Sequence, residues 1–120
     1  MPHITFEHSS NVKIDFQSFF KELSEQLVDT GHVPKLGVKC RAVSSDNYYI
    51  IDGNPEYQMV NLLIRLREGR SFEIRQQISL IGMKLMETYF QKEVKAKKII
   101  LSTEVKELIK ELDLTKNSIR

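Results

Sequence analysis

Residues 57–77 read YQMVNLLIRLREGRSFEIRQQ and combine an alternating apolar pattern, a polar turn and the start of a helical pattern. Apolar residues at every second position predict a strand over 57–67 with one buried face, carried by Val60, Leu62, Ile64 and Leu66. Ser71 is a good N-cap, so a long helix is expected over about 72–94. Its buried stripe should contain the residues at helical spacing, which are Ile74, Ile78, Ile81, Leu85 and Tyr89.

The first part of the chain repeats this order. PHITFE, residues 2–7, alternates apolar and polar side chains, and proline is tolerated at the first residue of a strand. A helix is expected over about 15–30, with Asp15 as its N-cap and Gly31 just after its end. The sequence therefore predicts a strand followed by a helix on each side of the chain's midpoint.

Each helix is followed by another predicted strand. One begins near Leu36 and carries Lys39 and Arg41 on the face opposite its apolar residues. Residues 52–55, Asp-Gly-Asn-Pro, form a strong turn signal before the third strand, and the fourth strand is expected over 98–103. A short terminal helix is expected after it from the helical spacing of Val105, Leu108, Ile109 and Leu112.

The resulting fold class is α+β, with two tandem β-α-β units that form a four-stranded sheet with two helices on one face. The expected pseudo-repeats cover about 2–52 and 57–105 of a single domain, residues 1–120, with a tail over 106–120. Such a sheet leaves its other face uncovered. A symmetric oligomer is the simplest way to bury it.

Composition restricts the functional class. Eighteen basic and sixteen acidic residues give a net charge of +2, which does not favour nucleic acid or a membrane surface as a partner. No signal peptide and no apolar run long enough to span a membrane are recognised. The lone Cys40 cannot form an internal disulfide, which fits a reducing compartment. We therefore expect a cytoplasmic protein.

Pro2 is the first candidate for chemistry. Removal of Met1 would leave a secondary amine, and apolar or cationic surroundings would lower its pKa toward neutrality, where a general base works best. Lys39, Arg41 and Arg70 are candidate anion-binding residues, because Arg70 lies where a strand turns into a helix N-terminus. The alternatives are a proline that only begins a strand and cations that are solvated surface charges.

Other side chains give weaker signals. His3, His8 and His32 lack metal-ligand spacing and are expected to be ordinary polar residues, so no metal site is predicted. Cys40 is expected in the core, and the basic run 92–98 fits a helix end.

Three segments resemble 5-carboxymethyl-2-hydroxymuconate isomerase, a family of the tautomerase superfamily. They are PHITFE, LREGRSFEIRQQ, and the ending LSTEVKEL followed by KNS, and the likeness covers nearly the whole chain. The resemblance implies that Pro2 is the general base and acid, and that Arg70 holds a substrate carboxylate. It places a second cation at Lys39, where relatives typically have arginine, or at Arg41, and Val60 stands at the place of the proline in the second unit.

The resemblance also implies a homotrimer without cofactor, acting on a small-molecule carboxylate. The implied reaction is a 1,3-type proton shift in a substrate such as 5-carboxymethyl-2-hydroxymuconate, from aromatic degradation. Two alternatives remain open: a tautomerase acting on another enol acid, and a non-catalytic oligomeric module of the same fold.

Overall fold

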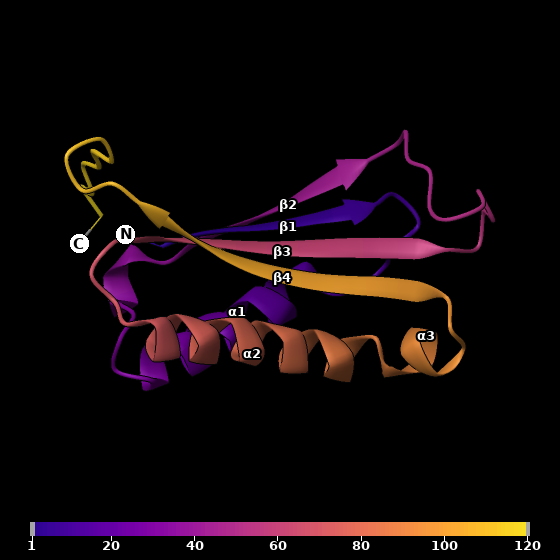
Figure 1. The fold of residues 1–120 in the computed structure, drawn as a ribbon, viewed down its shortest axis with the longest axis horizontal. Helices are drawn as coiled ribbons and strands as arrows, with labels where there is room; N and C mark the ends of the chain where they lie inside the picture. The colour runs from indigo at the N-terminus through magenta and orange to yellow at the C-terminus, as the bar shows by residue number, and fades with distance from the viewer. Residues whose placement is uncertain (1, 120) are drawn as a thin grey trace.

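The computed structural model describes residues 2–119 and confirms the two β-α-β units. Each unit has a strand, a main helix and a second strand, with a short 3-10 helix before β2 and a short helix after α2 (Figure 1). In chain order the elements are β1 (His3–Ser9), α1 (Phe16–Asp29), the 3-10 helix (Lys35–Gly37), β2 (Lys39–Ser45), β3 (Gln58–Arg67), α2 (Phe72–Tyr89), α3 (Gln91–Lys95) and β4 (Ile99–Leu108).

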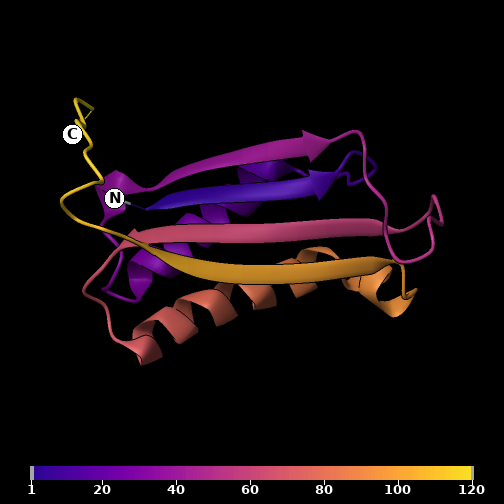
Figure 2. The same ribbon diagram turned by 45° about the horizontal axis from the view of Figure 1, so that its top comes forward.

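The strands form one sheet in the order β2-β1-β3-β4. β1 pairs with β2 in parallel and β3 with β4 in parallel, while the central pair β1 and β3 is antiparallel. Both main helices lie on the same side of the sheet, and Figures 1 and 2 show no described segment over the middle of the other side. We call this uncovered side the open face.

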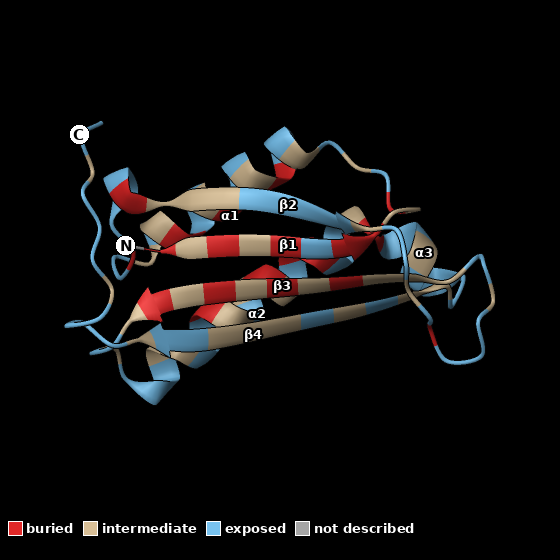
Figure 3. Cartoon of the chain, turned by 90° about the horizontal axis from the view of Figure 1, so that it is seen from above, coloured by how far each residue is buried: buried red, intermediate tan, exposed pale blue. Residues whose placement is uncertain are grey.

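The core lies between the sheet and the helices. Ile4 and Phe6 of β1 are completely buried, and so is the predicted apolar face of β3, seen as alternating colours in Figure 3. Phe6 packs edge-on against the ring of Phe19 at 5.2 Å. α2 approaches the sheet closely at Gly82, where a Cβ would lie 2.8 Å from Leu62 Cδ2. The bulk of the hydrophobic stabilisation is therefore on the helix side.

The predicted helix ends are confirmed. The Asp15 carboxylate accepts a hydrogen bond from the Ser18 N–H at 3.1 Å, and Gly31 follows α1 with φ +80°. Ser71 Oγ accepts from the Ile74 N–H at 3.2 Å. These caps place the first turn of α2 directly after the turn that contains Arg70.

The predicted end of the second helix is wrong. The second helix does not continue to Val94, because α2 ends at Tyr89 and Phe90 adopts φ −110° and ψ 21°. This break lets the Phe90 ring enter the core, where it stacks on Phe6 at 6.3 Å and is 1% exposed. α3 is a separate short helix after the break.

The predicted terminal helix is also wrong. Residues after Val105 continue β4 to Leu108, beyond the 98–103 strand expected from the sequence. β3 is ten residues long, and β4 pairs with its whole length, from Ile99 opposite Gln58 to Leu108 opposite Arg67. Pairing with an existing strand therefore overrides the helical spacing of the apolar residues.

The helices described between residues 2 and 119 include none that is long and apolar enough to cross a membrane.

Candidate active site

Pro2, Lys39 and Arg70 lie at one end of the sheet. β1 and β2 begin there, and β3 ends there before the turn into α2. Pro2 is buried, and its carbonyl accepts a hydrogen bond from the Lys39 N–H at 3.2 Å. The parallel pairing of β1 and β2 therefore fixes Lys39 beside Pro2 (Figures 1 and 2).

Lys39 is half-buried at this end. Its ammonium donates to the Gly37 carbonyl at 3.2 Å. Burial lowers the pKa of Lys39, and the charge of Asp113 opposes this while that of Arg41 adds to it. Arg41 is two residues further along β2, opposite Thr5, and its side chain is exposed. Two strand residues span about 7 Å, so Lys39 is the nearer of the two cations to Pro2.

Arg70 is held by two backbone carbonyls, one in the loop after α1 and one at the end of β3. Its Nε donates to the His32 carbonyl at 2.9 Å, and its Nη1 donates to the Arg67 carbonyl at 3.0 Å. Burial lowers the pKa of the guanidinium, so a neighbouring anion would be favourable there. A guanidinium has more N–H donors than these two contacts use. Arg70 is thus fixed in place and can still bind a carboxylate.

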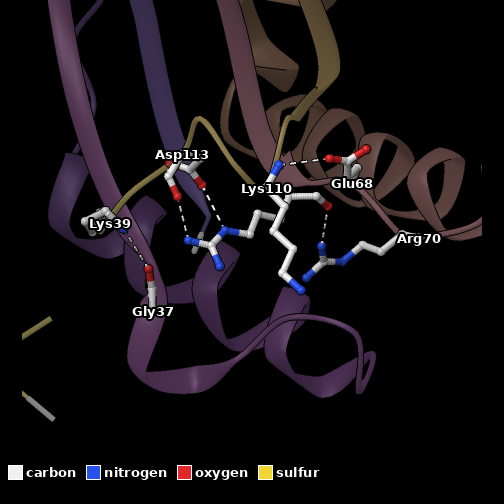
Figure 4. A network of polar contacts seen from close by, with 7 residues as sticks. Gly37, Lys39, Glu68, Arg70, Lys110 and Asp113 are labelled. Carbon is white, nitrogen blue, oxygen red and sulfur yellow. Dashed lines mark hydrogen bonds and ion pairs between the residues drawn. The ribbon is translucent and has the colours of Figure 1, made fainter. Parts of the chain in front are cut away.

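The C-terminal strap, residues 109–119, crosses this end of the sheet. Arg67 Nε contacts the Asp113 carboxylate at 3.2 Å, and Arg67 Nη2 donates to the Asp113 carbonyl at 2.6 Å. The Lys110 N–H donates to the Glu68 carboxylate at 2.8 Å. Figure 4 shows Lys39, Asp113, Lys110, Glu68 and Arg70 gathered in this region. The strap therefore forms one side of the candidate site.

A cavity of about 390 Å³ lies between residues 115–119 of the strap and residues 35–39. Asn117 Nδ2 closes one side by donating to the Leu36 carbonyl at 2.7 Å. No local sequence pattern predicts this contact, because the two residues are 81 positions apart in the chain. The cavity offers space for a small molecule next to Lys39.

His3 was expected to be an ordinary polar residue, but its environment is unusual. Burial lowers its pKa, as do the charges of Lys39, Arg65 and Arg41, while Asp113 opposes them. Cys40 is half-buried on the helix side of β2, and burial raises its pKa. The expected core position is therefore only partly enclosed. Residues 2–119 contain no group of three His, Cys, Asp or Glu side chains placed to hold a metal ion.

Comparison with known proteins identifies relatives along the whole chain. A family model described as 5-carboxymethyl-2-hydroxymuconate isomerase matches residues 2–120. The chain is 30% identical over 121 residues to the 5-carboxymethyl-2-hydroxymuconate Delta-isomerase of Escherichia coli, which covers 99% of this chain and 96% of that relative.

Solved structures show the same fold. The 5-carboxymethyl-2-hydroxymuconate isomerase of Deinococcus radiodurans R1 has a TM-score of 0.90 at 24% identity, covering 98% of this chain and 90% of that one. A fused 4-OT protein described as a symmetric trimer has a TM-score of 0.71 at 11% identity, covering 95% and 93%. The family resemblance expected from the three sequence segments is confirmed. The chain belongs to the 5-carboxymethyl-2-hydroxymuconate isomerase family, isomerases of the tautomerase superfamily.

Proposed function

We propose that this isomerase moves a proton within an unsaturated hydroxy or oxo acid with two or three carboxylates, such as 5-carboxymethyl-2-hydroxymuconate. Pro2 is the base and acid, and no cofactor takes part. The observation that carries the proposal is the position of Pro2, Lys39 and Arg70 at one end of the sheet. The relative's name supports the choice of substrate.

The proton step requires a free nitrogen at Pro2. Removal of Met1 leaves a secondary amine, and burial near positive charge disfavours its ammonium form. The nitrogen lone pair accepts a proton from an enol or allylic position of the substrate, which leaves a dienolate. The protonated proline then returns the proton to a distant carbon. The substrate is neither oxidised nor reduced, and Pro2 is regenerated.

Arg70 and Lys39 hold the substrate in this proposal. The remaining N–H donors of Arg70 bind one carboxylate, and its positive charge stabilises the dienolate. Lys39 binds a second carboxylate as a compact charge, because an ammonium lacks the planar fork of arginine. Arg41 is the alternative second cation, although it is further along β2.

Blocking the nitrogen of Pro2 tests the mechanism. Intact mass of the untagged protein should show that Met1 is absent. A variant with extra residues before Pro2 keeps the ring but turns its nitrogen into an amide, and we expect it to lose about 100-fold or more in kcat. Pro2→Ala tests whether the proline ring is needed. Pro55→Ala, in an exposed turn, is the matched control, and we expect its kcat to be unchanged. Wild-type activity in the N-terminally extended protein would remove Pro2 from the mechanism.

A substrate panel distinguishes the remaining alternatives. We expect faster turnover of a tricarboxylate muconate than of the matching dicarboxylate. Equal kcat/KM for the two would favour a tautomerase of another enol acid, and no turnover of any enol acid would favour a non-catalytic module.

We also propose a homotrimer assembled through the open face. Val43 and Ile100 are 44% and 45% exposed on that face in the single chain, and the fused 4-OT protein is described as a trimer. Val43→Glu should shift native mass spectra from trimer to monomer, whereas Leu80→Glu, on α2 with 51% exposure, should not. A trimeric Val43→Glu protein would contradict this assembly.

A further inference from the structure

Four basic side chains form one row across the open face. The strand register pairs Lys39 of β2 with His3 of β1, His3 with Arg65 of β3, and Arg65 with Lys106 of β4. Paired residues in neighbouring strands point to the same face, and neighbouring strands are about 4.8 Å apart. The four side chains, which we call the basic row, therefore lie side by side on the open face.

The basic row is poorly neutralised by the protein itself. Lys106 contacts the Glu104 carboxylate at 3.9 Å, and the nearby Asp113 carboxylate is already engaged by Arg67. Within residues 2–119, Lys39 and Arg65 take part in no ion pair. Arg65 and Lys106 are like charges on adjacent strands and repel each other, so the row favours an anion from outside the single chain.

Two atoms in the centre of the row point to the same conclusion. His3 Nδ1 and Arg65 Nε are buried and have no hydrogen-bond partner among the described residues. Buried polar groups are normally paired, and leaving them unpaired is unfavourable. The Nη groups of Arg65 form none of the side-chain hydrogen bonds described for residues 2–119, and arginine N–H groups suit the oxygens of a carboxylate or phosphate.

We propose that the basic row binds a small oxyanion, a phosphate or a carboxylate, at the Pro2 end of the open face. Val43 and Ile100, where the trimer contact is proposed, lie four and six residues from the row along β2 and β4. Arg65 provides the main hydrogen bonds, and Lys39 and Lys106 flank the anion on either side. His3 lies between Lys39 and Arg65, where a neutral imidazole donates one hydrogen bond without adding charge. The row shares Lys39 with the candidate active site of the proposed function, whereas its centre, Arg65, lies on the open face and Arg70 lies in the turn before α2.

Thermal unfolding of the untagged protein tests the site without reference to catalysis. Inorganic phosphate at about ten times its Kd should raise the Tm by about 5 °C for a chain of this size. Sodium chloride at the same ionic strength should produce little of this shift. Arg65→Gln and Lys106→Gln should each reduce the phosphate-dependent shift, whereas Lys92→Gln, which removes one exposed lysine from α3, should retain it.

Lys106 is exposed, so Lys106→Gln remains informative even if Arg65→Gln unfolds. A phosphate shift equal to the chloride shift, or one unchanged in Lys106→Gln and Arg65→Gln, would overturn the proposal. Kinetics then identify the source of the oxyanion. A phosphate-dependent rise in KM with constant kcat assigns the row to a substrate carboxylate, whereas a Tm shift without a change in KM assigns it to a free anion.

Discussion

Replacing Arg70 by alanine tests how the candidate site holds its substrate. In the structure, two N–H groups of Arg70 are bound to the carbonyls of His32 and Arg67, at 2.9 and 3.0 Å. The others remain for a substrate carboxylate. Charge-assisted hydrogen bonds contribute about 1.5–3 kcal/mol each, so losing a bidentate contact should lower kcat/KM by roughly 100-fold or more.

Arg70→Lys keeps the positive charge but loses the planar guanidinium that binds a carboxylate with two hydrogen bonds, so we expect an intermediate loss of roughly 10-fold in kcat/KM. We expect a smaller effect of Arg70→Ala on folding. His32 is exposed, so water can replace one of the two lost contacts, and Arg70→Ala should lose about 1 kcal/mol of unfolding free energy. That corresponds to a Tm lower by about 4 °C, so the variant stays folded during the assay.

Steady-state kinetics with an enol dicarboxylate, together with thermal unfolding, provide the measurement. Arg75→Ala is the matched control, because Arg75 lies near the start of α2, pairs with Glu107 at 3.4 Å on a partly exposed surface and contacts the backbone carbonyl of Arg70. Its kcat/KM should stay within about twofold of the wild type. Wild-type kcat/KM in Arg70→Ala, or an equal loss in Arg75→Ala, would refute the assignment of Arg70 as a carboxylate ligand.

Three further substitutions test the fold around the site. The folded-state pKa of His3 lies below the ordinary value of 6.5, so the unfolded chain takes up the proton first as the pH falls. The unfolding free energy, measured with urea, should therefore decrease below about pH 6.5, and it should decrease less in His3→Gln. Ser71→Ala removes the α2 cap and should lower the unfolding free energy by about 1 kcal/mol, measured by thermal unfolding with exposed Ser102→Ala as control. Gly82→Val forces its side chain against Leu62 and should reduce stability by about 1–3 kcal/mol in urea, so a stabilised variant would contradict the close packing of α2 on the sheet.

Local patterns were sufficient for most of the fold. The alternation in β3 and the caps at Asp15 and Ser71 act within a few residues, and each of these elements begins within one residue of the expected position. The errors came from contacts between distant residues. β4 extends because β3 offers a partner at every position, and α2 breaks because Phe90 enters the core beside Phe6. The spacing of apolar residues along the sequence does not predict either of these contacts.

The residues of the candidate site could be predicted from the sequence, but their arrangement in space could be predicted only in part. The turn that contains Arg70 and the strand position of Lys39 were visible in the sequence. The bond from Arg70 to the His32 carbonyl joins residues 38 positions apart, and the strap contact between Asn117 and Leu36 joins residues 81 positions apart. The basic row was missed because His3, Arg65 and Lys106 become neighbours only through the strand register.

The position of the candidate site at one end of the molecule has a practical consequence for attaching the protein to a surface. Residues 2 and 119 both lie at the end that carries Lys39, so a bead or electrode linked beside either residue would obstruct diffusion into that region. The opposite pole contains α3 and the exposed Lys97 (Figure 1). Amine coupling directed to Lys97 would orient the immobilised protein with Pro2 facing the solution.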